Sequence, residues 1–230
     1  MSDNLILVFS TPPAGVSPAE FSNWYDVHVR ELAAVDGFAG ARRYQVATIK
    51  GDWVPSGEHH LAVYETDGSP ADALRAVGER ATSGQLTLPD WFPQVNFATF
   101  ACYLHGDHAG PRLADHLYLV FSTPPAGLDN DEFVNWYQEH ADENTQVPGF
   151  VANWRFRLEP QLPAGSANAP ATHLAIYEVE RDLATLRANL GAAAEVNKAG
   201  WPAWFNPEPW TSLDANAVAG HVAAPAASQA

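Results

Sequence analysis

The sequence predicts an α+β protein in which one β-α-β-β-α-β module occurs twice in tandem. Three observations support this prediction. The nonapeptide LVFSTPPAG occupies residues 7–15 and recurs without change at residues 119–127. Further identities follow at the same spacing of 112 residues and, after one inserted residue, at 113. Within each copy, runs with the periodicity of strands and of helices follow one another in the same order.

The first copy begins with a strand at residues 5–9 (LILVF), which is apolar at every position, as in a strand covered on both faces. The following Pro-Pro-Ala-Gly cannot continue it. A helix then begins at Ser17-Pro18-Ala19-Glu20, a capping box with proline at the first helical position. Asp129 and Glu132 mark the same start in the second copy. Gly37 ends the first helix.

The rest of each copy completes a two-layer module. Residues 42–46 and 60–64 are predicted strands, 71–81 a second helix and 96–103 a closing strand. Four antiparallel strands with both helices on one face form the ferredoxin-like arrangement. This leaves the other sheet face bare, and a second copy can cover it sheet to sheet.

The repeat also predicts the domain boundaries. We expect a first ferredoxin-like module at residues 1–106, a linker at 107–114 and a second module at 115–218. Residues 219–230 are rich in Ala and Pro and contain little to bury, so we expect this tail to be poorly ordered.

Composition excludes several classes of protein. Of the 230 residues, 47% are hydrophobic and 17% are charged, which is typical of a folded globular chain. The net charge of −15 disfavours nucleic acid and anionic membranes as partners. The single Cys102 cannot form an intramolecular disulfide, no spacing resembles a zinc site, and we expect no metal or cofactor. The apolar run at residues 5–9 is too short for a signal peptide or membrane span, so we expect a soluble cytoplasmic protein.

A histidine on the first helix of each copy is the strongest candidate for chemistry. The helix stripe that faces the sheet consists of Phe21, Trp24, His28, Leu32 and Val35, and His140 is the equivalent of His28. Burying an imidazole is costly, and its pKa near neutrality suits it to move protons in a closed pocket. The alternative is a hydrogen-bonded core histidine, which a duplication would copy equally well.

A second group lies on the third strand of each copy. His60 and Tyr64 alternate onto one face, as do His173 and Tyr177. If this face looks toward the helix, each module surrounds one cavity with two histidines and a tyrosine. If it looks the other way, these residues line the interface between the sheets and are structural. The sequence leaves both interpretations open.

Other candidate residues differ in how far they match between the copies. Arg43 and Arg155 correspond, and either could bind a carboxylate or phenolate, although such an arginine is often simply solvated. Leu32 in the first copy becomes Asn144 in the second, so we expect two cavities of different polarity, of which only one need be active. The tryptophans near predicted pocket elements indicate either an aromatic ligand or a filled core, and they are Trp24, Trp91, Trp136, Trp201, Trp204 and Trp210.

The stretch Glu20-Phe21-x-x-Trp24-Tyr25-x-x-His28, followed by Gly37-Phe38 and Arg43-Tyr44, resembles the signature of EthD-like proteins in the dimeric α+β-barrel superfamily. The second copy repeats this pattern from Glu132 to Phe156. The aromatic pair is Trp-Tyr where EthD-like proteins tend to have Tyr-Trp. The resemblance implies a barrel normally built from two chains, here closed within one, with His28 and His140 as the family histidines.

The resemblance also implies a set of possible functions. The superfamily includes cofactor-free enzymes that act on aromatic or polyketide-like compounds, as well as haem enzymes. Our leading hypothesis is a cofactor-independent lyase, dehydratase or isomerase in which His28 or His140 is the general acid/base. Tyr64 or Tyr177, with His60 or His173, would stabilise the developing oxyanion. The alternatives are a haem enzyme with one of these histidines as axial ligand, or a non-catalytic protein that binds a small molecule. Pairing of the fused barrel into a homodimer is also open.

Overall fold

The computed structural model describes residues 4–50, 59–105, 113–161, 171–180, 183–205 and 210–225. The elements of the first half are β1 (Asn4–Thr11), α1 (Pro18–Ala33), β2 (Phe38–Lys50), β3 (His59–Thr66), α2 (Pro70–Thr82), η1 (Phe92–Gln94) and β4 (Asn96–Leu104). Those of the second half are β5 (His116–Ser122), α3 (Asn130–Thr145), β6 (Phe150–Gln161), β7 (His173–Val179), α4 (Leu183–Asn197), η2 (Lys198–Gly200), η3 (Ala203–Phe205), β8 (Trp210–Ala217) and β9 (Val222–Ala223).

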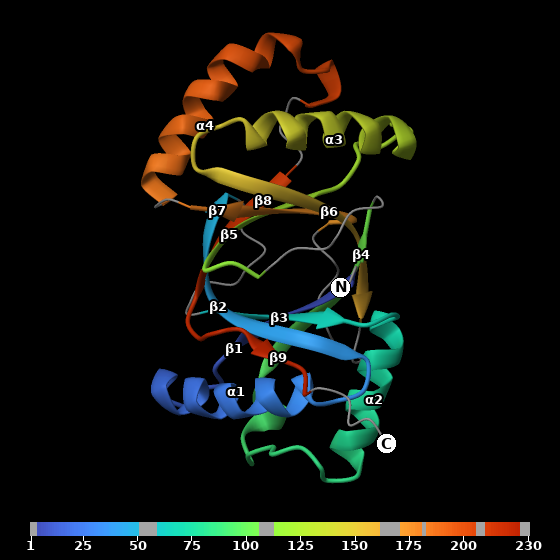
Figure 1. Cartoon of the computed structure of the whole chain (residues 1–230), viewed down its shortest axis with the longest axis vertical. Helices are drawn as coiled ribbons and strands as arrows, with labels where there is room; N and C mark the ends of the chain where they lie inside the picture. Colours follow the sequence, from blue (N-terminus) through green and yellow to red (C-terminus); the bar gives the residue numbers. More distant parts are fainter. Residues whose placement is uncertain are drawn as a thin grey trace.

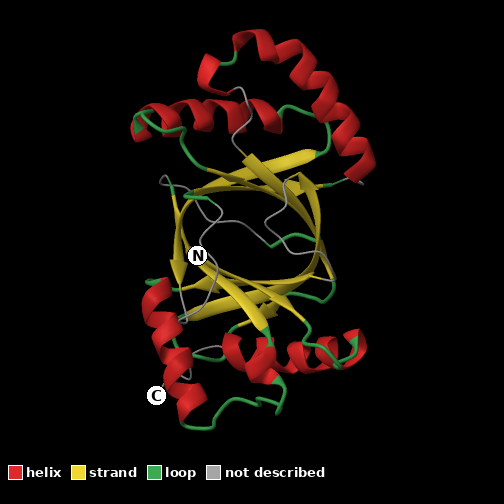
Figure 2. Cartoon of the chain, turned by 180° about the vertical axis from the view of Figure 1, so that it is seen from behind, coloured by secondary structure: helices red, strands yellow, loops and turns green. Residues whose placement is uncertain are grey.

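The strands form one continuous antiparallel barrel. Within the first half the strand order is β4-β1-β3-β2, and within the second it is β8-β5-β7-β6. The halves join at both edges, where β4 pairs with β6 and β2 pairs with β8. The predicted approach of the two sheets is therefore accompanied by edge-to-edge pairing, which leaves strands β1 to β8 in a closed ring (Figure 2). Closure satisfies the backbone groups of strands that would otherwise be open edges.

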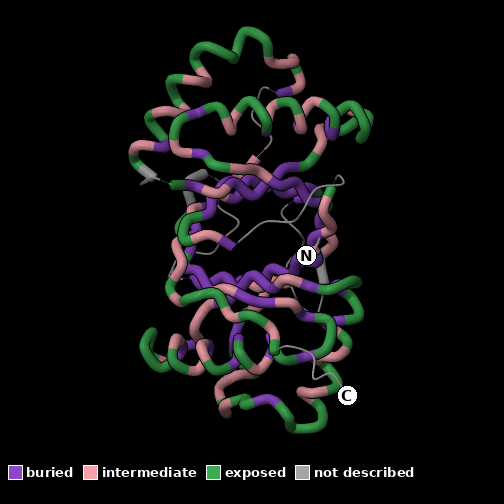
Figure 3. Tube along the Cα trace, in the orientation of Figure 1, coloured by how far each residue is buried: buried purple, intermediate pink, exposed green. Residues whose placement is uncertain are grey.

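Side-chain alternation separates two kinds of core. Leu5, Leu7 and Phe9 of β1 point into the barrel, where they meet Leu119 and Phe121 of β5. The intervening residues of each strand point outward and pack beneath the helices. Figure 1 shows α1 and α2 against one end of the barrel and α3 and α4 against the opposite end. Buried residues are concentrated along the strands, as Figure 3 shows, so the barrel interior is the main apolar core.

The predicted helix starts are confirmed by their caps. The side-chain oxygen of Ser17 accepts a hydrogen bond from the backbone N–H of Glu20 at 3.2 Å. Asp129 accepts from the N–H groups of Asp131 and Glu132 at 2.9 and 3.1 Å. Both caps satisfy backbone donors that the first helical turn leaves unpaired. They set the register of α1 and α3, and therefore which side chains of each helix face the sheet.

The expectation that residues 219–230 are poorly ordered is wrong for part of this tail. Val222 and Ala223 form β9, which pairs with Gly40 and Ala41 of β2. The reason is backbone hydrogen bonding, because β8 covers the same edge of β2 only from Tyr44 onward. Residues 226–230 lie outside the described residues, as do residues 51–58 and most of the predicted linker.

Candidate functional site

The outward face of β3 and β7 looks toward the helices. Ala62 and Tyr64 belong to the cluster beneath α1 and α2, whereas Leu61 and Val63 point into the barrel. Tyr177 in the second half lies beneath α3 and α4 in the same way. Of the two orientations that the sequence left open, the structure therefore has the one that places the third-strand residues on the helix side.

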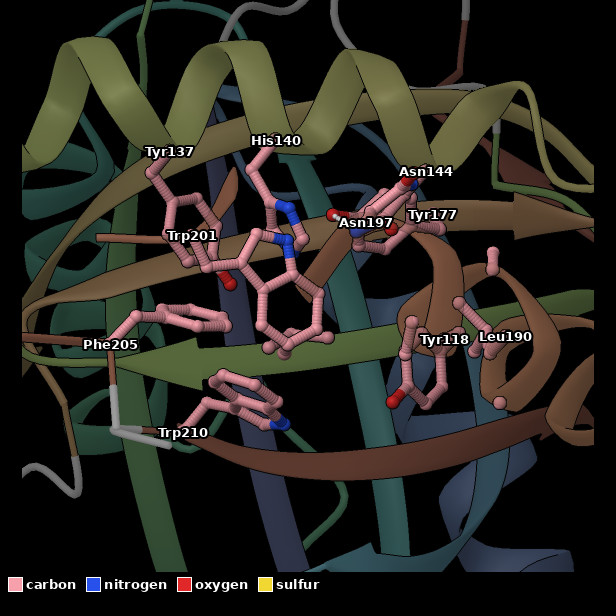
Figure 4. A pocket seen from close by; sticks show the side chains of 14 residues that line it. Tyr118, Tyr137, His140, Asn144, Tyr177, Leu190, Asn197, Trp201, Phe205 and Trp210 are labelled. Carbon is pink, nitrogen blue, oxygen red and sulfur yellow. Dashed lines mark hydrogen bonds between the residues drawn. The ribbon is translucent and has the colours of Figure 1, made fainter. Parts of the chain in front are cut away.

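A cavity of about 210 Å³ lies between the sheet and the helices of the second half (Figure 4). Its walls come from β5, α3, β7, α4, η3, β8 and Trp201, which follows η2. The residues that line it are Tyr118, Val120, Tyr137, His140, Asn144, Tyr177, Leu190, Gly191, Ala193, Ala194, Asn197, Trp201, Phe205 and Trp210. A cavity of about 150 Å³ admits benzene, so this one has room for one or two fused rings.

The side chain of His140 projects from α3 into this cavity. Its ring stacks on Trp136 with centroids 4.8 Å apart and an interplanar angle of 11°. Its Nδ1 lies 3.7 Å from Oε2 of Glu143 and has no hydrogen-bond partner among the described residues. Burial lowers the pKa of His140 from 6.5 to about 4. The imidazole is therefore neutral at pH 7, and it can accept a proton or a hydrogen bond.

Tyr177 and Asn144 form a second polar group on the cavity wall. The Asn144 amide donates to the Tyr177 hydroxyl at 3.2 Å. Burial raises the pKa of Tyr177 well above its usual value of 10.0, so its hydroxyl keeps its proton at neutral pH. Because this hydroxyl accepts from Asn144, its own O–H is directed elsewhere and can donate to a ligand. Tyr118 lies beside it, with ring centroids 6.1 Å apart.

The first half repeats the histidine but not the polar wall. His28 stacks on Trp24 at 4.7 Å, and burial lowers its pKa to about 4. Its neighbour Glu31 is engaged by both the backbone N–H and the hydroxyl of Thr87. The residue on α1 that corresponds to Asn144 is Leu32, which is buried. The difference in polarity that the sequence predicted is thus present in the walls around the two histidines.

The two arginines hold helices to the sheet. Arg43 is 1% exposed and donates to the carbonyl oxygen of Ser22 at 2.9 Å and to the carboxylate of Asp26, both on α1. Arg155 donates to the carbonyl oxygen of Val134 on α3 at 2.6 Å. Neither arginine lines the cavity at His140. Arg43 is thus paired with a carboxylate of the chain, although its Nε has no hydrogen-bond partner among the described residues, and Arg155 is held by a backbone carbonyl and the ring of Tyr137.

The remaining predicted residues do not line this cavity, and those of the first half lie under α1 and α2. The rings of His60 and His173 lie 5.1 Å from those of Phe21 and Phe133, respectively. Trp136 packs behind His140. The structure therefore gathers His140, Tyr177 and Asn144 at one cavity, and it places the strand histidines and both arginines outside that cavity.

Sequence reasoning missed several lining residues. Tyr137 and Phe205 resemble ordinary core positions, and Asn197 lies at the end of α4, where helix periodicity alone predicts no contact. Tyr118 had a readable signal, because it alternates with Leu117 and Leu119 and therefore points to the helix side of β5. Trp201 and Trp210 are among the tryptophans for which the sequence indicates either an aromatic ligand or a filled core, and the structure places both on the cavity wall.

The lining residues do not fit a haem group. A porphyrin is much larger than the one or two rings that about 210 Å³ can hold. Its propionates need cationic partners, and the lining set contains no Lys or Arg. Within the part of the chain that the structure describes, no group of three or more His, Cys, Asp or Glu side chains is placed to bind a metal ion.

No described helix combines the length and the apolar character needed to cross a membrane.

Comparison with known proteins identifies the fold. No family model matches the sequence, and the search of curated proteins finds no match. Among solved structures, an "anthrone oxidase-like protein" aligns with a TM-score of 0.52 and 15% identity, over 98% of this chain and 97% of its own. A "Putative monooxygenase" from Fusobacterium nucleatum aligns with a TM-score of 0.50 and 10% identity, over 96% and 95%. The chain therefore has the fold of the dimeric α+β barrel.

Proposed function

We propose that this chain is a cofactor-independent enzyme whose active site is the cavity at His140. It moves a proton on a small aromatic substrate and is a lyase, dehydratase or isomerase. In this proposal the barrel derives from two ferredoxin-like modules of the EthD-like kind. The single observation that carries the proposal is a neutral, solvent-shielded imidazole that points into an aromatic cavity with a second polar group on its wall.

The chemistry follows from the two polar groups. The neutral His140 ring takes a proton from a carbon next to a carbonyl, and the electron pair moves onto the carbonyl oxygen to form an enolate. The Tyr177 hydroxyl, positioned by Asn144, donates to that oxygen. Return of the proton at another carbon gives isomerisation. Delivery of the proton to a departing β-hydroxyl gives water and a double bond.

The names of the two structural neighbours agree with an enzyme that acts on small molecules. The cavity volume favours one or two rings over a larger polycyclic compound. The pKa of about 4 makes His140 a weak base that is deprotonated at neutral pH. It therefore passes the proton on readily, as both reactions require.

The test is exchange of α-protons of bicyclic aryl ketones, such as 1-tetralone, in deuterated buffer, followed by mass spectrometry. Exchange reports proton abstraction whatever the net reaction is. We expect His140→Gln to lower the enzyme-dependent rate at least about 100-fold, the lower end of what a positioned acid/base contributes.

The sequence repeat supplies the matched control. His28→Gln makes the same change in an almost identical ring stack, and we expect it to retain the rate within a few-fold. Equal losses in both variants, or no loss in either, would contradict the proposal. Ketones that bind but never exchange would identify a non-catalytic binding protein.

A further inference from the structure

We infer that Trp201 selects the substrate: its indole N–H donates a hydrogen bond to a carbonyl or hydroxyl oxygen of an uncharged aromatic ligand. The inference deepens the proposed function and rests on it for the identity of the active cavity. It adds the charge class of the substrate and a residue that recognises it.

The Trp201 indole nitrogen is an unpaired donor in the cavity wall. Nε1 is buried and has no hydrogen-bond partner within the described residues, although Trp201 lines the cavity. Buried indole N–H groups usually find a partner, because leaving one unpaired costs free energy. A ligand oxygen in the cavity would supply that partner.

Trp201 lies at the same end of the cavity as the proposed base. Its ring meets that of His140 edge to face, with centroids 5.6 Å apart and an interplanar angle of 87°. Figure 4 shows the two side chains next to each other, with Phe205 close by. A ligand oxygen bound by Trp201 is therefore held beside the group that moves the proton.

The first half lacks this donor. At the spacing of 113 residues, the position of Trp201 corresponds to Leu88, a side chain that cannot hydrogen bond. The flanking aromatic residue is kept, because Phe205 corresponds to Phe92. The indole N–H and Asn144 thus occur together in the half that contains the cavity. This is what we expect of groups that bind a ligand there.

The charges around the cavity favour a neutral ligand. The lining set has no Lys or Arg. The nearby Arg155 lies over the ring of Tyr137, 4.6 Å from its centroid, and donates to the backbone. Glu143 lies 3.7 Å from Nδ1 of His140, so a carboxylate ligand would lose its hydration without gaining a cation. A cationic ligand would meet the positive end of the Trp201 N–H dipole.

Tyr177 and Asn144 provide a second polar contact on the wall of the same cavity. Figure 4 shows Asn144, Tyr177 and Asn197 grouped to the right of His140, with the Trp201 ring below His140. The Tyr177 hydroxyl accepts from Asn144 and has its own proton to donate. The cavity therefore suits a flat aromatic ligand with polar oxygens that can meet both the Trp201 N–H and the Tyr177 hydroxyl.

The experiment measures binding of four bicyclic probes by equilibrium dialysis: naphthalene, 1-naphthol, 1-naphthoate and N-methylquinolinium. We expect the wild-type chain to bind 1-naphthol about five- to tenfold more tightly than naphthalene, as one added hydrogen bond predicts. We expect 1-naphthoate and N-methylquinolinium to bind more weakly than 1-naphthol.

The variant Trp201→Phe keeps an aromatic ring and removes the N–H. We expect it to lose the preference for 1-naphthol while its affinity for naphthalene stays within twofold, which also shows that the cavity still forms. The matched control is Trp204→Phe, because Trp204 packs on Trp136 at 4.9 Å but does not line the cavity. We expect this control to bind both probes as the wild type does.

Three results would overturn the inference: tighter binding of either charged probe, a Trp201→Phe variant that keeps the preference for 1-naphthol, or no binding of any probe. The exchange rate of the His140→Gln variant distinguishes failure of this inference from failure of the proposed function. If its exchange rate falls while Trp201→Phe keeps the preference, the active site stands and only the recognition role of Trp201 fails.

Discussion

At the scale of single residues, burial decides the chemistry of the histidines. His28, His60, His140 and His173 each have a pKa lowered to about 4, with burial as the main cause. In the unfolded chain a histidine titrates near 6.5. Between these values the unfolded state binds more protons than the folded state, so stability falls as the pH falls from 6.5 toward 4.

We expect His28→Leu to reduce this acid sensitivity. Lowering the pH from about 7.5 to about 5 should reduce the free energy of unfolding of the wild type by about 1–2 kcal/mol more than that of the variant. The reason is that the variant has lost one buried titrating group. Urea unfolding at both pH values measures the difference. His116→Gln changes an exposed histidine and serves as the control. A variant with the wild-type pH dependence would show that His28 is not held neutral by the fold.

At the scale of elements, β9 attaches the end of the described chain to the barrel. Its backbone pairs with Gly40 and Ala41, and the adjacent His221 contacts Glu65 of β3 at 2.7 Å. Gly40 is required where these side chains cross it. A Cβ at Gly40 would lie 2.4 Å from Oε2 of Glu65 and 2.8 Å from Nε2 of His221. The glycine thus lets the hydrogen-bonded His221–Glu65 pair pack directly over the strand.

We expect Gly40→Ala to lower the free energy of unfolding by about 0.5–1.5 kcal/mol, because the added methyl must displace the ends of these two side chains and break their hydrogen bond. Hydrogen exchange at Val222 and Ala223 should accelerate with it. The matched control is Gly78→Ala on α2, where an added Cβ meets nothing within 4 Å and should stabilise the helix by up to about 1 kcal/mol. Unchanged exchange at β9 in Gly40→Ala would contradict the role assigned to the glycine.

At the scale of the whole molecule, the two halves share one core and two strand junctions. The barrel interior combines side chains such as Leu7 and Phe100 with Leu119 and Leu213 from the other half. The β4–β6 and β2–β8 pairings close the ring across the halves. Neither half can keep its inner face covered alone, so the chain should unfold as one cooperative unit.

We expect Leu7→Ala to lower the free energy of unfolding by about 2–5 kcal/mol, the range for a buried leucine. Far-UV circular dichroism and tryptophan fluorescence, which report on both halves, should keep a single coincident transition. Val196→Ala, at a side chain that is 79% exposed, should change stability by less than about 0.5 kcal/mol. Two separate transitions would show that the halves unfold independently.

The order of elements, the helix starts at Ser17 and Asp129, and the different polarity of Leu32 and Asn144 follow from the sequence alone. These features depend on residues close together in the chain, where periodicity and capping are local properties. Tertiary structure alone decided that the third-strand residues face the helices, that both arginines bind backbone carbonyls, that β9 forms, and that Trp201 meets His140. Alternation places side chains on opposite faces of a strand, but only the packing of distant segments determines what each face contacts.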